Sequence, residues 1–352
     1  MNKISAVDLF CGVGGLTYGL KRANILVRAG YDIDPVCEYP YKYNNNAVFL
    51  NKDISEVKGE DLSCWFKRGE IRLLAGCAPC QPFSSYSQGR DTSKDKKWPL
   101  LYEFSRLIRE LEPELVTMEN VPDVVKHEVY HDFVEQLLDQ DYHVFAKAIY
   151  CPEYGMPQIR TRHVLLASKL GPISLNFRKR KPFQYKTVSD AIGRLPAICA
   201  GGQDSNDSLH KAANLSELNM KRIIASKPGG SWWDWDVDLR AECHRKSSGR
   251  SYSGVYARMR WDKPSPTITT QCYGFGNGRF GHPEQNRAIS LREAAILQTF
   301  PKKYRFVEPG NQIEFRTIGR LIGNAVPVKL GEVIGRSIKK HVKEHLSLKY
   351  RE

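Results

Sequence analysis

The stretch "KISAVDLFCGVGGLTYGLKRA", from Lys3 to Ala23, contains the pattern that decides the fold class. It begins as a short apolar run of the kind that forms a β-strand, continues through a glycine-rich turn and ends in a segment that reads as a helix. Further strand-like runs follow at 24–34, 47–54, 70–80, 114–121, 142–151 and 161–168, with amphipathic helices predicted at 101–113 and 129–140. The pattern is that of repeated strand–helix units.

Strands that alternate with helices across residues 1–168 predict an α/β fold with a doubly wound, mixed but mainly parallel sheet. In such sheets ligands bind at the carboxyl ends of the strands. The side chains expected to converge on that rim are Asp8, Asp32, Asp53, Cys80 and Glu119. After Ser168 the composition changes to basic, glycine-rich and tryptophan-containing segments, which predict a second, less regular domain.

The net charge of +14 and the isoelectric point near 9.3 favour a polyanionic partner, most simply a nucleic acid, although many intracellular proteins are also basic. No apolar run is long enough for a membrane span, and the first residues lack a signal-peptide pattern. We therefore expect a protein that stays in the cell and does not engage membranes. Its nine cysteines are then free thiols unless one of them is catalytic or binds a metal.

The glycine-rich turn is consistent with a nucleoside-containing cofactor. Gly12, Gly14 and Gly15 allow a ligand to approach the backbone, but Thr17 occupies the position of the third glycine of a dinucleotide motif. Asp32, at the end of the next strand, is placed to accept hydrogen bonds from ribose hydroxyls, and Asp53 suits an amino group on a base. A tight turn without a ligand is the alternative.

Cys77 and Cys80 form a C-x-x-C pattern that three kinds of chemistry could explain. A zinc site would need further ligands, and the sequence has no second C-x-x-C. A thioredoxin-like redox pair does not suit this strand order, and an ordinary buried cysteine remains an alternative. Pro79 restricts the backbone before Cys80, which helps to present one thiol rigidly.

Two further motifs supply partners for a reactive thiol. "TMENV" places Glu119 at a strand end, and "QIRTRHV" places Arg160 and Arg162 two residues apart, which predicts that both lie on one face of a strand. A solvated acid and an exposed basic edge are the simpler interpretations of the two motifs taken separately.

Together these motifs resemble those of the bacterial cytosine-5 DNA methyltransferases, in the same order and across nearly the whole chain. The matching segments are "DLFCGVGGL", "GCAPCQPFS", "ENV", "QIRTRHV", "KPSPTITT" and "GNAVPVKLGEVIG". The resemblance implies a Rossmann-like methyltransferase fold and an S-adenosyl-L-methionine-dependent enzyme, with S-adenosyl-L-homocysteine as product and no metal. It implies that Cys80 is the nucleophile, Cys77 a bystander and Glu119 the acid that contacts ring nitrogen 3 of cytosine. We expect Arg162 to contact the cytosine carbonyl oxygen and Arg160 to orient the pair.

The resemblance also implies the cofactor contacts and the domain boundaries. The expected cofactor-binding residues are Asp8, Phe10, Gly12, Val13, Gly14, Gly15, Asp32, Ile33, Asp53, Ile54, Pro79, Asn324 and Ala325. The expected catalytic domain comprises residues 1–185 plus 310–346, and residues 186–309 form an inserted target-recognition domain with its hinge. Within that domain the candidate base-reading side chains are Arg245, Lys246, Arg250, Arg258 and Arg260, whereas Trp232, Trp233 and Trp235 are expected to pack internally.

The predicted partner is double-stranded DNA, from which the target cytosine must be flipped out. A monomer is expected, in the bacterial cytoplasm at the nucleoid, with a cognate restriction endonuclease that acts separately. Three alternatives remain. The same chemistry on transfer RNA is disfavoured because the Cys-Phe-Thr signature is missing, and a non-catalytic DNA-binding protein is disfavoured by the intact Cys80, Glu119 and Arg162 set. A nicotinamide oxidoreductase is disfavoured by Thr17.

Overall fold

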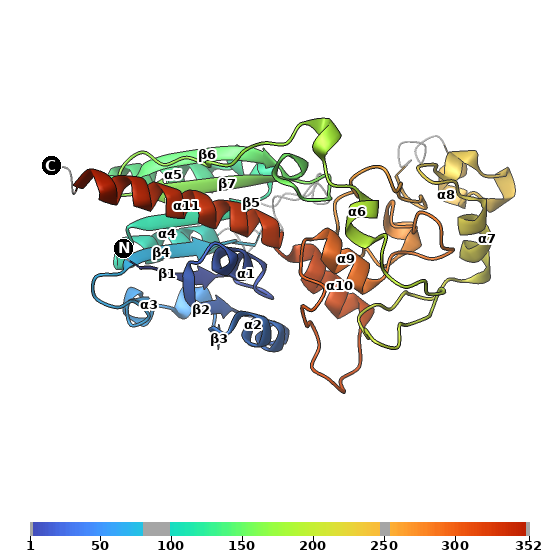
Figure 1. Cartoon of the computed structure of the whole chain (residues 1–352), viewed down its shortest axis with the longest axis horizontal. Coiled ribbons are helices and arrows are strands. Elements are labelled where there is room, and N and C mark those ends of the chain that lie inside the picture. Colours follow the sequence, from blue (N-terminus) through green and yellow to red (C-terminus); the bar gives the residue numbers. More distant parts are fainter. Residues whose placement is uncertain (1–2, 80–98, 247–253, 350–352) are drawn as a thin grey trace. The chain divides into compact units, whose positions relative to one another are not determined.

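The computed structural model describes residues 3–79, 99–246 and 254–349, which form two compact units (Figure 1). The first unit contains residues 1–154, 161–179 and 326–352, and the second contains 155–160 and 180–325. This division differs from the predicted one at 155–160, 180–185 and 310–325, all of which belong to the second unit. The C-terminal difference arises because helix α10 (Phe315–Asn324) packs against helix α9 (Leu291–Leu297) of that unit.

The first unit is built on a seven-stranded sheet with the order β3-β2-β1-β4-β5-β7-β6. Neighbouring strands from β3 to β5 pair in parallel, whereas β7 is antiparallel to both β5 and β6. The strands are β1 (Ile4–Leu9), β2 (Leu26–Asp32), β3 (Val48–Asn51), β4 (Ile71–Gly76), β5 (Leu115–Asn120), β6 (His143–Tyr150) and β7 (Thr161–Ser168). The prediction of a mixed, mainly parallel α/β sheet is confirmed. All residues of β1 and β5 are buried, as expected for central strands covered on both faces.

Helices α1, α2, α3, α4, α5 and α11 surround this sheet. Their bounds are α1 (Gly15–Arg22), α2 (Glu38–Asn45), α3 (Gly59–Ser63), α4 (Pro99–Leu111), α5 (Glu128–Asp139) and α11 (Val328–Lys349). The predicted apolar stripe of α4 is buried in the core, where Phe104 packs against Phe133 of α5. Helix α11 lies along α1 (Figure 1), and a side chain at Gly19 would collide with the backbone of α11. The last helix therefore packs on the first strand–helix unit.

The described part of the second unit contains helices and turns but no sheet, and its extended segments meet only at isolated bridges. Besides α9 and α10, its helices are α6 (Val188–Ile192), α7 (Glu217–Ala225) and α8 (Glu242–Arg245). An irregular chain of this kind needs other partners for its buried backbone groups, because unpaired buried carbonyls and amides are costly. In the second unit, arginine side chains supply many of these partners.

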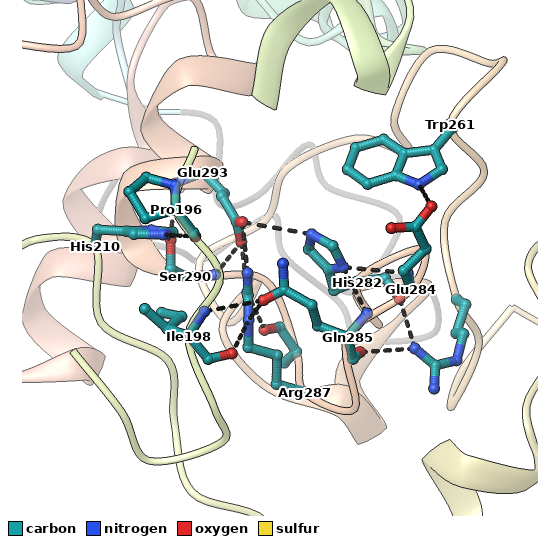
Figure 2. A network of polar contacts seen from close by, with 12 residues as sticks. Pro196, Ile198, His210, Trp261, His282, Glu284, Gln285, Arg287, Ser290 and Glu293 are labelled. Atoms are coloured by element: carbon teal, nitrogen blue, oxygen red, sulfur yellow. Dashed lines mark hydrogen bonds and ion pairs between the residues drawn. The ribbon is translucent and has the colours of Figure 1, made fainter. Parts of the chain in front are cut away.

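A buried ion pair lies at the centre of this arrangement (Figure 2). Arg287 donates to both carboxylate oxygens of Glu293, at 2.7 and 2.8 Å, and both side chains are fully buried. Glu293 also accepts the backbone N–H of Ser290 at the start of α9. Burial raises the pKa of Glu293, but the hydrogen bonds and positive charge of Arg287, together with the Ser290 N–H, outweigh burial, and the net pKa is lowered. The carboxylate is therefore ionised and satisfied.

Two histidines, His282 and His210, extend the network. His282 accepts the backbone N–H of Gln285 at Nδ1, so its Nε2 carries the proton of the neutral ring and faces Glu293 (Figure 2). Burial lowers the pKa of His282 to about 4. On the other side, His210 bonds Ser290 Oγ and the carbonyl of Pro196. These bonds join segments that are distant in the sequence.

The structure corrects one expectation about the base-reading candidates. Arg258 is buried and donates to the carbonyls of Ile223, Ser226, His282 and Gln285, so it stabilises the unit and is not available to read bases. Arg260 is exposed beside Asp262, and Arg245 and Lys246 are exposed, whereas Arg250 lies outside the described residues.

The tryptophans of the second unit behave largely as predicted. Trp232 and Trp235 are fully buried, which confirms internal packing for both. Trp233 is 43% exposed and stacks on Trp232, with ring centroids 4.6 Å apart. It therefore covers the aromatic core of this unit from the solvent side.

We expect Arg287→Ala to destabilise the second unit by about 3–5 kcal/mol, because it leaves a buried carboxylate without its counter-charge. The measurement is urea unfolding followed by tryptophan fluorescence, since Trp232, Trp233, Trp235 and Trp261 all lie in this unit. Arg260→Ala, which removes an exposed arginine from the same unit, is the control and should leave the unfolding midpoint in place. Equal midpoints for the two variants would contradict the structural role of the Arg287–Glu293 pair.

Candidate active site and cofactor site

The glycine-rich loop between β1 and α1 has the backbone geometry that its sequence predicts. Gly12 has a φ of +51°, and a side chain placed there would meet no atom within 4 Å, so the loop presents open space at this point. Gly14 has a φ of +89° and lies against Asn45 and Tyr41, where a side chain would collide. Gly15 is the first residue of α1, whose N-terminal N–H groups suit a polar or anionic ligand.

Asp32 holds this loop in place. It is the last residue of β2, next to β1 in the sheet. Its Oδ2 accepts the backbone N–H of Gly12 at 2.7 Å, and its Oδ1 accepts that of Asp34 at 2.9 Å. A carboxylate oxygen has two lone pairs, so these bonds leave capacity for a ligand hydroxyl. The position therefore suits the predicted ribose contact.

The side chains around Asp32 provide apolar surface and a further carboxylate. Ile33, directly after β2, is 65% exposed and offers apolar surface next to Asp32. Phe10 is half-buried, has a φ of +56° and touches Phe104 edge-on. Asp53 caps the short turn 54–56 through the backbone N–H and hydroxyl of Ser55.

Three of the predicted cofactor residues have buried side chains. Asp8 lies inside β1 and is fully buried, so the structure contradicts the expectation that its side chain lies on the rim. Strand β1 continues through Leu9, so Asp8 lies within the strand and not past its end. Val13 and Ile54 are also buried, Ile54 within the main core cluster, so only their backbones are placed to contact a ligand.

Asp8 instead belongs to an internal polar cluster. Its Oδ2 accepts the Thr17 hydroxyl at 2.6 Å, and the same hydroxyl oxygen lies 3.1 Å from the phenol of Tyr41. Burial, which outweighs the Thr17 hydrogen bond, raises the pKa of Asp8 to about 7. Thr17 occupies the position of the third glycine of a dinucleotide motif, and its hydroxyl has the buried Asp8 as a hydrogen-bond partner.

Asn324 and Ala325 belong to the second unit. Asn324 is the exposed last residue of α10, and Ala325 is its C-cap. Gln298 donates its side-chain amide to the carbonyl of Ala325 at 3.4 Å. Their contact with a cofactor stays a prediction.

Glu119 and Arg162 meet on neighbouring strands of the first unit. Because β7 runs antiparallel to β5, the start of β7 lies beside the end of β5, and Glu119 is directly opposite Val164. Arg162 Nε is 3.1 Å from Glu119 Oε1, and the Glu119 side chain is only 3% exposed. The structure thus brings together two of the predicted catalytic residues as a buried ion pair.

The segment that leads to Cys80 is fixed next to this pair. Cys80 itself lies outside the described residues. The Asn120 side-chain amide donates to the carbonyl of Ala78 at 3.3 Å, which ties the end of β5 to the residue before Pro79. Cys77 donates its thiol hydrogen to Glu119 Oε2, with 3.0 Å between Sγ and the oxygen.

Arg160 departs from the prediction that it shares a strand face with Arg162. Strand β7 begins at Thr161, and Arg160 belongs to the second unit. Its buried guanidinium donates to the carbonyls of Ile268 at 3.0 Å and Gly323 at 3.4 Å. The structure therefore supports a scaffolding role for Arg160 in the second unit.

Sequence reasoning missed the contacts of Cys77, Asn120 and Gln158. Gln158 donates to Gln298 Oε1 at 2.9 Å and accepts the backbone N–H of Ile268 at 2.9 Å. Asn120 and Gln158 were visible as members of the "ENV" and "QIRTRHV" motifs. For Cys77 no local signal existed, because its partner Glu119 is 42 residues away.

The family model for C-5 cytosine-specific DNA methylases matches residues 4–340, nearly the whole chain. The chain belongs to the C-5 cytosine-specific DNA methylase family. It is therefore an enzyme, a DNA (cytosine-5-)-methyltransferase. The family assignment excludes the alternative of a non-catalytic DNA-binding protein.

Relatives and solved structures agree with this assignment. The methyltransferase is 52% identical to the type II methylase M.HgiDII of Herpetosiphon aurantiacus over 339 residues, covering 96% of this chain and 95% of the relative. It is 30% identical to the type II methyltransferase M1.HphI of Haemophilus parahaemolyticus, covering 96% and 87%. A prophage-encoded chain from E. coli, described as a DNA modification methyltransferase, shares the fold with a TM-score of 0.74 at 23% identity, covering 97% of this chain and all of the other.

Within residues 3–79, 99–246 and 254–349, no group of three or more His, Cys, Asp or Glu side chains is arranged to hold a metal ion. In the same part of the chain, no helix has the length and apolarity needed to cross a membrane.

We expect Asp32→Ala to raise the Kd for S-adenosyl-L-methionine about 10- to 100-fold. The substitution removes a charged acceptor for a ligand hydroxyl and releases the Gly12 backbone. Isothermal titration calorimetry measures this effect, with the exposed Glu38→Gln in α2 as a control that also removes one negative charge. Unchanged affinity in Asp32→Ala would rule out the proposed ribose contact.

The raised pKa of Asp8 predicts a pH-dependent stability. An Asp ionises near 4 in the unfolded chain but near 7 in the fold, so its stabilising contribution is complete below pH 4 and is lost as the pH rises toward 7. Relative to Asp8→Asn, the wild type should lose a few kcal/mol of unfolding free energy over this interval. Urea unfolding of both proteins between pH 4 and pH 7.5 measures the difference, and a constant difference would contradict the raised pKa.

Proposed function

We propose that this methyltransferase transfers a methyl group from S-adenosyl-L-methionine to carbon 5 of a cytosine within a specific sequence of double-stranded DNA. The transfer proceeds through a transient covalent bond between Cys80 and the cytosine ring. The observation that carries the proposal is the buried Glu119–Arg162 pair beside the segment that leads into Cys80.

The chemistry explains why an acid, a guanidinium and a thiol are needed together. Carbon 5 of cytosine is too weak a nucleophile to take a methyl group directly. Addition of the Cys80 thiolate at carbon 6 makes the ring electron-rich at carbon 5. Carbon 5 then bonds to the donated methyl carbon as the sulfonium–methyl bond breaks. The carbon 5 proton leaves to water, and elimination of the Cys80 thiolate restores the aromatic ring.

Glu119 and Arg162 assist the addition step. The Glu119 carboxyl group contacts ring nitrogen 3 and the exocyclic amine, and a proton shared between Glu119 and ring nitrogen 3 draws electrons away from carbon 6. Arg162 donates to the carbonyl oxygen of the ring. Because Arg162 also pairs with Glu119, one ion pair orients both groups toward the same edge of the base.

The residues of the cofactor site fit S-adenosyl-L-methionine. When bound, the cofactor supplies an electrophilic methyl group on a sulfonium centre. The open space at Gly12 admits a ligand against the backbone, and Asp32 accepts hydrogen bonds from the ribose hydroxyls. The exposed Ile33 and the edge of Phe10 pack on the adenine ring, and Asp53 accepts its amine.

The DNA must present the base outside the duplex. Carbons 5 and 6 are not accessible within the stack, so the cytosine is flipped out, at a cost of about a few kcal/mol. The net charge of +14 provides phosphate contacts that offset this cost. The second unit, with exposed Arg245, Lys246 and Arg260, reads the sequence.

The relatives suggest the biological setting. M.HgiDII and M1.HphI are named as type II methylases, so we propose that a cognate restriction endonuclease acts separately on the same DNA sequence. A monomer located at the bacterial nucleoid is sufficient for this role.

A covalent trap tests the proposal. Plasmid DNA copied with 5-fluorodeoxycytidine triphosphate carries a fluorine where the carbon 5 proton must leave, so the enzyme should remain attached through Cys80. We expect an adduct that survives denaturing electrophoresis with wild type and cofactor, and none with Cys80→Ser.

Two controls sharpen this experiment. Cys80→Ser should still bind DNA in a mobility-shift assay, which separates loss of chemistry from loss of binding. Tritiated methyl transfer should favour duplex DNA over transfer RNA. An adduct of wild-type yield with Cys80→Ser would overturn the assignment of the nucleophile.

A further inference from the structure

Cys77 has a defined place beside the catalytic glutamate. It directly follows β4, and its backbone N–H donates to the carbonyl of Leu9 at 3.3 Å, which extends the hydrogen bonding between β4 and β1 by one residue. From this anchored position its Sγ lies 3.0 Å from Glu119 Oε2. The family resemblance assigns no role to this thiol.

The two oxygens of the Glu119 carboxylate have different neighbours, an ion-pair partner at Oε1 and a hydrogen-bond donor at Oε2. Oε1 faces Arg162 at 3.1 Å from β7, and Oε2 accepts from Cys77 at the end of β4. Strand β5, which carries Glu119, lies between β4 and β7 in the sheet. Rotation of the carboxylate about its last torsion would break the hydrogen bond from Cys77 and separate Oε1 from the Arg162 guanidinium.

We propose that Cys77 is a positioning residue that fixes the orientation of the Glu119 carboxyl group through its S–H donor. The inference rests on the proposed role of Glu119 in contacting cytosine. Because the Glu119 side chain is only 3% exposed, solvent is poorly placed to replace this donor. A neutral thiol also holds Oε2 without a second positive charge that would compete with Arg162.

Two substitutions test whether Cys77 acts as a hydrogen-bond donor or only fills space. Cys77→Ala removes the donor and part of the volume, whereas Cys77→Ser keeps a hydroxyl donor of similar size. Single-turnover methyl transfer from tritiated S-adenosyl-L-methionine to plasmid DNA, at saturating cofactor and DNA, measures the chemical step. We expect Cys77→Ala to lower this rate about three- to tenfold and Cys77→Ser to restore most of it. The Kd values for cofactor and DNA should not change.

A double-mutant cycle shows whether the effect acts through Glu119. In a Glu119→Gln background, Cys77→Ala should cause no further loss of rate, because the carboxylate that it positions is gone. Cys199→Ala, at an exposed cysteine of the second unit, is the matched control and should keep the wild-type rate. Thermal unfolding of every variant reports whether the fold is intact.

The Glu119 and Cys77 variants test the role of Glu119 and the role of Cys77 separately. If Glu119→Gln methylates DNA at the wild-type rate, the proposed role of Glu119 is wrong. If Glu119→Gln is impaired but Cys77→Ala is not, only the positioning role of Cys77 is overturned. The positioning role is equally overturned if Cys77→Ser is as slow as Cys77→Ala, or if Cys77→Ala lowers the rate by the same factor in both backgrounds.

Discussion

The ion pair between Glu119 and Arg162 is the constraint on which the catalytic arrangement depends. Both side chains are largely withdrawn from water, so each needs the other to offset the loss of hydration. The antiparallel direction of β7 makes this pair possible. In a wholly parallel sheet the strand beside β5 would begin at the opposite edge, whereas the antiparallel β7 brings its first residues to the carboxyl end of β5. The reversal of one strand thus assembles the acid and the guanidinium.

The same edge of the sheet carries the proposed cofactor site. Asp32 at the end of β2 accepts the backbone N–H of Gly12 in the loop after β1, Cys77 follows β4, and Glu119 is the residue before the end of β5. Each of these groups is held by regular backbone pairing behind it. The loops that carry chemistry therefore begin from rigid positions, which keeps the reacting groups in register.

The sequence alone predicts the positions of groups that are placed by residues near them in the chain. The glycine turn, Asp32 and Glu119 follow from strand ends and from turn chemistry, and the structure places them accordingly. Arg160 was misplaced because an alternating pattern cannot show where strand pairing begins, and its guanidinium is directed by carbonyls of Ile268 and Gly323 more than 100 positions away. Burial of Arg258 and the contact of Cys77 depend likewise on residues that only the tertiary fold brings near.

The absence of a sheet from the described part of the second unit has an evolutionary consequence. Gln158 and Arg160 precede the long segment 180–325. Their contacts to it include backbone groups of Ile268, Leu297 and Gly323 and the side chain of Gln298. Backbone carbonyls persist whatever side chains they carry. The exposed positions of the unit that we propose reads DNA can consequently diversify, or be exchanged by recombination, while this attachment survives.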